Sequence, residues 1–399
     1  MNILYLTSEY KDESLGKDDP FVFISNSFCR KWVKQGHKVV VIHNASCFPK
    51  IIYYIPSKIK KIFEKKFGYC WGSYKSVCEK KYIDNGVDVY RLSIKKYIPH
   101  RSPSKKVLKN ASDTIVAILR KQNFIPNVII GQWGSPQAEI ISRLSRVYSC
   151  PTSVVFHGTY IDKKNTDYLS DLATINKIGA RSNSQAEIIQ KKLNLDMKPF
   201  VCYSGLPDEY IKQYHLNLEK YTHIIKWKFV FVGRLVEYKK ADIIIKALSR
   251  IDNINWELNI IGDGAQLNEL KKIAIANNCE KKVIFHGNIP RDKVLEILNG
   301  CHCFIMASVN EVFGLVYLEA MGASCITVAS KKGGIDGVII NEQNGFLIDE
   351  GSEEQLYELI KDITVVDPET LKKIASKAYE TALSFSEDKV AIDYLNKVL

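Results

Sequence analysis

The chain has 399 residues, of which 46% are hydrophobic and 25% are charged, as is typical of a globular protein with a substantial core. This composition excludes a mainly disordered, collagen-like or coiled-coil chain, and at about 150 residues per domain the length predicts two domains. No apolar run approaches the roughly 18–20 residues that a membrane span needs. The first residues, MNILYLTSEY, are typical of a strand and not of a signal peptide.

Positive charge is concentrated in the first half of the chain. Residues 1–205 hold 33 Lys and Arg against 16 Asp and Glu, whereas residues 206–399 hold 23 against 28. The segment 49–109 alone holds 16 basic residues against 4 acidic ones. Such a local field predicts an anionic partner for the first half.

The ten cysteines form no CxxC pair and mostly lie in apolar segments, which indicates reduced core residues of a cytosolic protein. The sequence Cys301-His302-Cys303 is the closest approach to a zinc site, but no second ligand pair has a suitable spacing. We therefore expect no bound metal.

Short apolar runs alternate with amphipathic stretches in the first half. Strands are predicted at Asn2–Leu6, Val39–His43, Val87–Leu92, Val128–Ile130 and Thr152–Phe156, and helices at Phe21–Gln35 and Lys105–Lys121. The pattern breaks near residues 205–226 and then starts again. Its strands are predicted at Phe229–Val232, Trp256–Ile261, Val283–His286, Cys303–Met306 and Cys325–Val328. Its helices are predicted at Ala241–Arg250, Gln266–Asn277, Arg291–Gly300 and Phe313–Met321.

Continuous apolar strands that alternate with helices form parallel sheets covered on both faces, so the fold class is α/β with two doubly wound domains. We place the first domain at residues 1–205 and the second at 206–383, and expect a helix over 384–399 to pack back onto the first domain. Parallel sheets bind ligands beyond the carboxyl ends of their strands, so the residues that follow each strand are the candidates for chemistry.

The first candidate is Gly233-Arg234-Leu235 with the downstream Lys239, at a strand end. Gly233 permits a tight turn, and a planar Arg fork and a compact Lys charge suit a diphosphate. Two further strand ends run into glycine turns, Gly262-Asp263-Gly264 and Gly333-Gly334-Ile335-Asp336-Gly337, whose backbone amides suit phosphate or sugar oxygens. For each of these fragments alone, an ordinary turn or surface cation is the alternative.

The most specific candidate is the segment from Glu311 to Glu319, two carboxylates around Phe313-Gly314-Leu315. If that tripeptide opens a helix, its free N–H groups and positive dipole end suit a phosphate. Glu319 then lies just over two turns later, at a similar azimuth to the loop that carries Glu311. The alternative is a pair of solvated glutamates around a core helix.

Together these four candidates resemble the retaining glycosyltransferases of family 4, which have the GT-B fold of two Rossmann-like domains facing across a cleft. The resemblance extends to His157-Gly158 after a strand, to Arg181-Ser182-Asn183-Ser184 before a helix and to Asn344-Gly345-Phe346-Leu347. It covers essentially the whole chain, is strongest over 229–348 and is weakest over 44–150, where family members differ and acceptors bind.

The resemblance implies that the first domain binds an acceptor and the second a nucleotide-diphosphate sugar. The catalytic residues it implies are Glu311, Arg234, Lys239 and His157. In these roles Arg234 and Lys239 neutralise the leaving diphosphate, Glu311 contacts the donor sugar, and His157 lies across the cleft near the reacting carbon.

The donor-binding residues that the resemblance implies are Gly16, Gly233, Gly262, Phe313, Gly314, Leu315 and Glu319. Glu319 would hold the ribose, and Gly16 would let the first loop approach the phosphates. The sequence departs from the family in three places: Lys240 replaces the usual glycine after the Lys, the first loop has a single glycine, and Asp336 stands where many members place a small segment before a Glu.

The implied reaction breaks the bond between an anomeric carbon and a nucleotide diphosphate, so its main demand is to stabilise the leaving anion. No DxD-type carboxylate pair lies in a credible loop, so we expect a metal-independent enzyme without a cofactor that moves a hexose-type sugar with retention. The acceptor, the sugar and the nucleotide are not fixed by the sequence.

The segment Ile51–Phe67 places apolar residues on one helical face and lysines on much of the rest. This fits a short helix on an anionic membrane surface, or equally a solvated helix packed on its own domain. Membrane attachment suits a lipid-linked glycan acceptor in bacterial cell-surface polysaccharide synthesis, with the enzyme cytoplasmic and peripheral at the inner membrane face.

Two other functions are alternatives. A glycoside hydrolase would use Glu311 and Glu319 as acid and nucleophile, but would leave Arg234, Lys239 and the glycine turns unexplained. A non-enzymatic protein that binds nucleic acid or membrane would explain the basic first half and not the site residues of the second. We expect no nucleic-acid partner.

Overall fold

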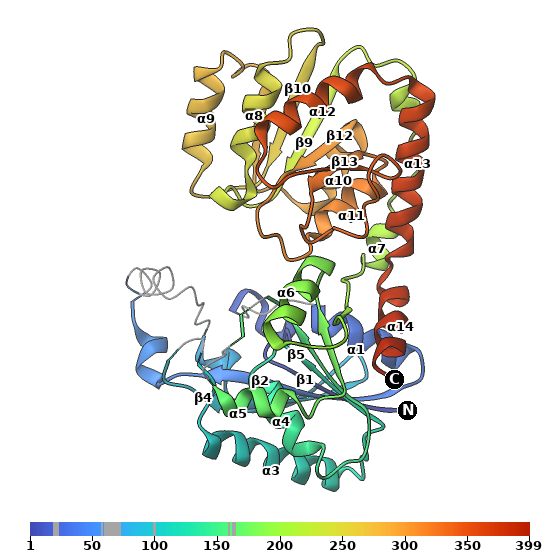
Figure 1. Ribbon diagram of the computed structural model, residues 1–399. Helices are drawn as coiled ribbons and strands as arrows, with labels where there is room; N and C mark the ends of the chain where they lie inside the picture. Colours follow the sequence, from blue (N-terminus) through green and yellow to red (C-terminus); the bar gives the residue numbers. More distant parts are fainter. Residues whose placement is uncertain (19–23, 57–58, 60–72, 99–100, 159, 162–164) are drawn as a thin grey trace. The chain divides into compact units, whose positions relative to one another are not determined.

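The computed structural model describes residues 1–18, 24–56, 59, 73–98, 101–158, 160–161 and 165–399 (Figure 1). The chain divides into two compact units. The first consists of Met1–Ala180, Ile188–Cys202 and Ala391–Leu399, and the second of Arg181–Glu187 and Tyr203–Val390. The chain therefore returns to the first unit with its last residues.

The first unit is built on an eight-stranded sheet in the order β3-β4-β2-β1-β5-β6-β7-β8. Its strands are β1 (Asn2–Thr7), β2 (Lys38–Cys47), β3 (Lys80–Asp84), β4 (Val87–Lys95), β5 (Val128–Gln132), β6 (Thr152–Phe156), β7 (Lys177–Ala180) and β8 (Phe200–Val201). All neighbouring strands are parallel except β3 and β4, which form a hairpin. Both turn residues of the hairpin, Asn85 and Gly86, have positive φ angles of 47° and 85°. Asn-Gly is the sequence that such a two-residue turn favours.

The helices of the first unit are α1 (Ile24–Lys34), α3 (Lys105–Lys121), α4 (Gln137–Leu144) and α5 (Thr166–Leu172), with 3-10 turns at Glu13–Asp18, Lys50–Tyr54 and Tyr74–Ser76. Two further helices, α6 (Asn183–Leu193) and α14 (Glu387–Val398), have residues in both units. The end of α14 packs against α1: the Trp32 indole donates to the Ala391 carbonyl at 2.9 Å, and the Phe28 and Tyr394 rings meet edge to face.

The second unit is built on a six-stranded sheet in the order β11-β10-β9-β12-β13-β14, in which every pair is parallel. Its strands are β9 (Trp227–Val232), β10 (Trp256–Ile261), β11 (Val283–Gly287), β12 (Cys303–Met306), β13 (Ile326–Ser330) and β14 (Phe346–Ile348). Its helices are α7 (Asp208–Ile211), α8 (Ala241–Ser249), α9 (Leu267–Ala276), α10 (Arg291–Gly300), α11 (Leu315–Gly322), α12 (Glu353–Val365) and α13 (Pro368–Ser384), with 3-10 turns at Glu219–Tyr221 and Glu237–Lys239.

The predicted fold class is confirmed, because both units are α/β with parallel sheets. Each strand and helix predicted above is present within a few residues of its expected bounds. One local expectation is wrong: Phe313 and Gly314 precede α11, which begins at Leu315. The sequence patterns also missed β3, which lies antiparallel at the edge of the first sheet.

Each sheet contains a point where the strand order reverses. In the second unit the chain moves from β9 outward through β10 to β11, and then crosses to β12 on the other side of β9. In the first unit the same reversal separates β1 from β5. Loops diverge at such points and leave a crevice at the carboxyl edge, where ligands of open α/β sheets bind.

None of the helices in the described part of the chain is long and apolar enough to cross a membrane. The nine described cysteines, all except Cys70, are free thiols.

Candidate active site

Two glycine turns pack backbone against backbone at the carboxyl ends of β9 and β10. The Gly233 N–H donates to the Ile261 carbonyl at 2.9 Å, and Gly262 has a φ of 132°. A Cβ on Gly262 would lie 2.0 Å from the Gly233 carbonyl oxygen, and one on Gly264 would lie 2.4 Å from that of Leu235. Both glycines of the Gly-Asp-Gly sequence are therefore required by close packing, whatever they bind.

Lys239 and Glu311 form an ion pair across the point where the second sheet reverses. Lys239 ends the 3-10 turn that follows β9, and Glu311 lies in the loop that follows β12. The Lys239 Nζ contacts Glu311 Oε2, and it lies 3.6 Å from the Met306 sulfur. Both side chains of the pair are only 12% exposed, so this charge pair is held in a largely desolvated place.

The start of α11 lies beside this pair. Gly314 caps the helix in the left-handed conformation with a φ of 78°, and no side chain bonds to the free N–H groups of the first turn. The glycine loop after β13 lies directly against it, since a Cβ on Gly334 would be 2.3 Å from the Phe313 Cα. The third and fourth candidates of the sequence are thus brought together around an uncapped helix start, which favours an anion.

Arg234 is exposed and does not contact Lys239 directly. Its Nη2 donates to the Tyr238 hydroxyl at 2.7 Å, and the Lys239 Nζ lies 5.8 Å from the centre of the Tyr238 ring. The two cations thus both contact Tyr238, one by a hydrogen bond and the other over its ring. Their joint approach to an anion stays a prediction.

Glu319, on α11, does not share a cation with Glu311. Its Oε1 forms an ion pair with Arg291 Nη2, and the Glu319 side chain is 5% exposed. Arg291 is the functional candidate that the sequence analysis missed. A signal was present: Arg291 is the first residue of α10, where the positive end of the helix dipole disfavours a cation.

His157, Gly16 and their neighbours belong to the first unit. His157 follows β6, and its ring stacks on Trp133 with centroids 3.8 Å apart. Its Nε2 contacts the Gln132 side-chain oxygen, and the Gln132 amide donates to the Tyr394 hydroxyl at 2.9 Å. The ring of His157 is therefore fixed by β5 and by α14.

A half-buried carboxyl group, Glu9, follows β1 and was not singled out from the sequence. Burial raises the pKa of Glu9 to about 7. The neighbouring Ser8 hydroxyl accepts from the Gln137 side-chain amide at 2.9 Å, which bridges the reversal point between β1 and β5. The same amide nitrogen donates to the Gln132 carbonyl.

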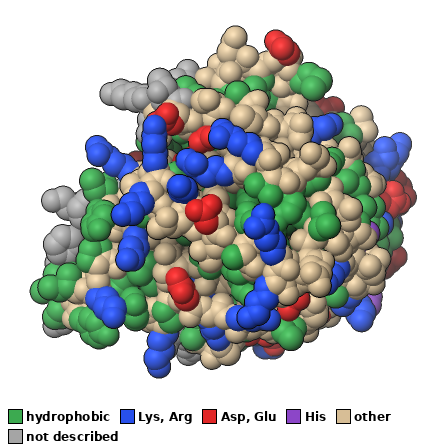
Figure 2. All heavy atoms as spheres, turned by 90° about the horizontal axis from the view of Figure 1, so that it is seen from below, with side chains coloured by type: hydrophobic (Ala, Val, Ile, Leu, Met, Phe, Trp, Pro, Cys, Tyr) green, Lys and Arg blue, Asp and Glu red, His purple; other side chains and the backbone are tan. Residues whose placement is uncertain are grey.

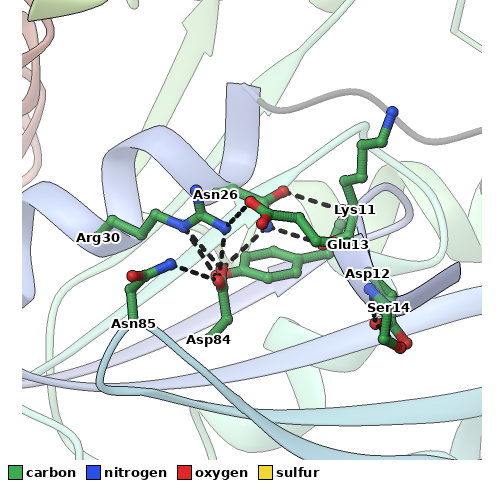
Figure 3. A network of polar contacts seen from close by, with 9 residues as sticks. Lys11, Asp12, Glu13, Ser14, Asn26, Arg30, Asp84 and Asn85 are labelled. Carbon is green, nitrogen blue, oxygen red and sulfur yellow. Dashed lines mark hydrogen bonds and ion pairs between the residues drawn. The ribbon is translucent and has the colours of Figure 1, made fainter. Parts of the chain in front are cut away.

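The loop after β1, which carries Gly16, is anchored by a network of polar contacts (Figure 3). Asp84, the last residue of β3, accepts from Arg30 at 2.5 Å and from Asn26 at 3.0 Å, and Arg30 also pairs with Glu13 in the loop at 2.6 Å. Gly16 itself has a φ of 54°, and among the described residues no atom beyond its two chain neighbours lies within 4 Å of where its Cβ would be. An open, left-handed glycine on an anchored loop suits a close approach of a ligand to the backbone.

A second carboxylate in the same loop is held from the sheet. Asp12 accepts from Lys80 at 2.6 Å and from the fully buried Arg91 at 2.8 Å. Burial acts to raise the pKa of Asp12, but the hydrogen bonds from Lys80 and Ser14 outweigh burial and lower it. The first loop is thus attached to β3 and β4 at two points.

The described residues contain no group of three or more His, Cys, Asp or Glu side chains arranged to hold a metal ion. In the sequence Cys301-His302-Cys303, the His302 Nδ1 accepts from the Lys228 N–H at 2.9 Å. Burial lowers the pKa of this imidazole to about 4.

Of the basic segment Ile51–Phe67, only residues 51–56 and 59 are described. Ile51 and Tyr54 are each 75% exposed. Apart from Ile59, the predicted helix from Lys58 onward lies outside the described residues.

Comparison with known proteins places this site in context. Residues 208–381 match a family model described as "Glycosyl transferases group 1". An uncharacterized glycosyltransferase of Methanocaldococcus jannaschii is 26% identical over 303 residues, which cover 74% of this chain and 82% of the relative. An N-acetylgalactosamine-N,N'-diacetylbacillosaminyl-diphospho-undecaprenol 4-alpha-N-acetylgalactosaminyltransferase of Campylobacter jejuni is 26% identical over 74% of this chain and 79% of the relative.

Solved structures resemble the fold of the whole chain. A glycosyltransferase from Rickettsia africae has a TM-score of 0.67 at 17% identity, covering 99% of this chain and 97% of that one. The Anabaena protein HepE in complex with UDP has a TM-score of 0.63 at 16% identity, covering 99% of each chain. The fold is therefore that of GT-B glycosyltransferases, and together with the family model and the sequence relatives these matches support glycosyltransferase activity.

Proposed function

We propose that the protein is a retaining glycosyltransferase that moves a hexose-type sugar from a nucleotide-diphosphate sugar to an acceptor hydroxyl. The observation that carries this proposal is the desolvated Lys239–Glu311 pair at the reversal point of the second sheet, beside the uncapped start of α11. A cation, a carboxylate and free helix amides at one edge match a ligand with both a diphosphate and sugar hydroxyls.

In this reaction the bond between the anomeric carbon and the β-phosphate oxygen breaks, and negative charge collects on the leaving diphosphate. Lys239, the α11 amides and Arg234, once it turns from Tyr238, stabilise that charge, and preorganised donors of this kind are among the largest catalytic contributions. Glu311 accepts hydrogen bonds from the donor sugar. The acceptor oxygen attacks on the face from which the diphosphate leaves, and its proton passes to the leaving oxygen.

The acceptor we propose is a lipid-linked glycan of bacterial cell-surface polysaccharide synthesis. The Campylobacter relative is named for an undecaprenol-diphosphate substrate, which supports an acceptor of this class. The basic first half adds support, because lipid diphosphates and bacterial membranes are anionic. Figure 2, taken from the side of α3, shows Lys and Arg side chains spread over that face. The exposed cations of α3 are Lys105, Lys106, Lys109, Arg120 and Lys121.

Donor transfer is tested with purified protein, a panel of UDP-, GDP- and ADP-sugars, and polyprenyl-diphosphate-linked saccharides. We expect release of one nucleotide diphosphate that depends on the acceptor. Lys239→Ala should slow it by about 100- to 1000-fold, whereas Lys246→Ala, which changes a half-exposed cation of α8, should not change it. Release of free sugar without any acceptor would instead favour a glycoside hydrolase, and no turnover or nucleotide binding with any donor would refute the proposal.

Two finer parts of the proposal have tests of their own. Retention is read from the anomeric configuration of the product by NMR, and an inverted product would overturn it. We also propose that Lys239 and Arg234 replace a metal, so excess EDTA should leave the rate unchanged, and restoration of a lost rate by Mg²⁺ or Mn²⁺ would contradict this.

Attachment to the membrane surface is tested by flotation with liposomes that contain or lack anionic lipid. We expect flotation only with anionic lipid, weakened at high salt. If recovery with the floating liposomes is the same with and without anionic lipid, the acceptor, and not the membrane, is the anionic partner of residues 49–109.

A further inference from the structure

Arg291 occupies a position that local helix chemistry disfavours. It is the first residue of α10, and its side chain is 40% exposed. A cation in the first turn faces the positive end of the helix dipole and is destabilising there. The contacts of its side chain must therefore supply the compensation.

Those contacts are an anion on one side and an aromatic face on the other. The Arg291 guanidinium pairs with Glu319 of α11, and its Cζ lies 4.3 Å from the centre of the Tyr210 ring. A planar guanidinium stacks on aromatic rings and forks onto carboxylates, which a lysine cannot do. Arg291 is thus fixed in orientation by two elements, α7 and α11.

Tyr214 is a buried neighbour of this cluster. It is 3% exposed, and its ring is seated on Gly322, where a Cβ would lie 2.8 Å from the ring carbons. Burial raises the pKa of Tyr214, while the nearby Arg291 charge acts to lower it. The buried Tyr214 therefore lies close enough to the guanidinium to feel its charge.

The Glu319 carboxylate still has acceptor capacity beyond this ion pair. An ionised carboxylate accepts about four hydrogen bonds. In the part of the chain that the structure describes, no other cation or side-chain donor contacts it. Glu319 lies on the same helix whose uncapped start lies beside Glu311, about one turn from the first residue of that helix, Leu315.

We propose that Arg291 is a positioning residue that holds the Glu319 carboxylate in one orientation to accept hydrogen bonds from the ribose hydroxyls of the nucleotide, with Tyr210 as the platform of the guanidinium. This inference rests on the proposed function, because it requires a nucleotide donor. Without Arg291 the carboxylate rotates freely and binds its own water. The loss of Arg291 then weakens nucleotide binding and selectivity for the ribose, and does not slow the chemical step.

The test compares ribose with deoxyribose. Binding of the preferred nucleoside diphosphate and of its 2′-deoxy and 3′-deoxy analogues is measured by calorimetry for wild type and variants. Because a hydrogen bond to a charged group is strong, wild type should prefer the ribonucleotide over at least one analogue by about 10- to 100-fold. Arg291→Ala should weaken ribonucleotide binding by about 10-fold and bring this preference below about 3-fold.

Further variants separate positioning from folding. Arg291→Lys keeps the charge without the fork and should restore only part of the preference. Lys293→Ala removes an exposed cation of the same helix, paired with Glu296, and should match wild type. In the donor assay Arg291→Ala should raise KM about 10-fold, with kcat reduced by less than about 3-fold.

If Arg291→Ala does not fold, Tyr210→Leu removes the platform while Tyr210→Phe keeps it, and only the Leu variant should lose ribose preference. An Arg291→Ala protein that folds and keeps the full wild-type preference overturns the inference. Failure of wild type to bind any nucleotide would instead overturn the proposed function, so the two failures are distinguishable.

Discussion

At the carboxyl edge of the second sheet Lys239 and Glu311 lie in an ion pair, whereas the edge of the first sheet carries the Gln132 amide, the His157 ring and the half-buried Glu9. Full charges that are desolvated and paired favour a strongly anionic ligand that can compete for the cation. Amides, an imidazole and a carboxyl group with a raised pKa favour hydroxyl groups. The difference is what we expect if, as proposed above, the second unit binds a nucleotide diphosphate and the first a sugar acceptor.

The two units also fix their loops differently. The second unit brings loops together through glycines, at places where even a Cβ would collide with backbone. The first unit anchors the loop after β1 by ion pairs of Arg30 with Asp84 and of Lys80 with Asp12, and leaves Gly16 open. Close backbone packing at Gly233, Gly262 and Gly264 makes the glycine turns of the second site rigid, while side-chain contacts hold the loop of the first. Variants of each kind should therefore affect each unit in a different way.

The largest effect is expected from the charge pair. Lys239→Ala and Glu311→Ala should each lower kcat/KM by about 100- to 1000-fold, because each removes a group held next to the developing charge or the sugar. The exchanged variant, Lys239→Glu with Glu311→Lys, restores an ion pair but misplaces the cation, and should be no more active. Recovery of activity by the exchange would show that the pair serves stability and not the ligand.

The packed glycine turns after β9 and β10 are the next most sensitive feature. Gly262→Ala would place a Cβ 2.0 Å from the Gly233 carbonyl oxygen at a φ of 132°, so the backbone must shift. We expect a loss of about 3 kcal/mol or more in the free energy of unfolding of the second unit. Gly300→Ala is the matched control, because nothing lies within 4 Å of its Cβ and alanine suits a helix. Equal denaturation midpoints for the two variants would contradict the claim that close packing requires a glycine at position 262.

A smaller loss is expected from the anchor of the first loop. Burial acts to raise the pKa of Asp84, but the hydrogen bonds from Arg30, Tyr10 and Asn26 outweigh burial and lower it. Asp84→Asn removes the buried partner of Arg30 and leaves it only the exposed Glu13, which should cost about 3 kcal/mol. Glu354→Gln, which breaks the exposed pair with Arg250, should have no measurable effect on urea unfolding. A stable Asp84→Asn protein would mean that Glu13 alone anchors Arg30.

The strands and glycine turns were predictable from sequence because they depend on local patterns, apolar runs and φ preferences. The edge strand β3 was missed because its residues alternate in exposure and make no continuous apolar run, although Asn85-Gly86 marked its hairpin. The ion pairs could not be predicted. Lys239 and Glu311 are 72 positions apart and meet only because the sheet reverses between β9 and β12. Arg291 carried a local signal, its unfavourable place in α10, but not the identity of its partner.

The smallest expected effect concerns acid stability of the first unit. His43 is fully buried in the middle of β2, and burial lowers its pKa to about 3 from the ordinary 6.5. The unfolded chain therefore binds a proton below about pH 6.5 that the folded chain does not, so stability is complete above that pH and falls as the pH drops towards 3.

Between pH 7 and pH 5 this difference should remove about 2 kcal/mol from the free energy of unfolding. The loss should shrink in His43→Gln and persist in His223→Gln, which changes an exposed histidine of the second unit. Urea unfolding at the two pH values measures it. In parallel, the His43 ring signal in NMR should stay that of a neutral imidazole down to pH 5. Protonation of His43 at pH 6 would contradict the lowered pKa. The charged edge of the second unit has no part in this titration. Between pH 7 and pH 5 we therefore expect the free energy of nucleotide binding to change by less than the free energy of unfolding of the first unit.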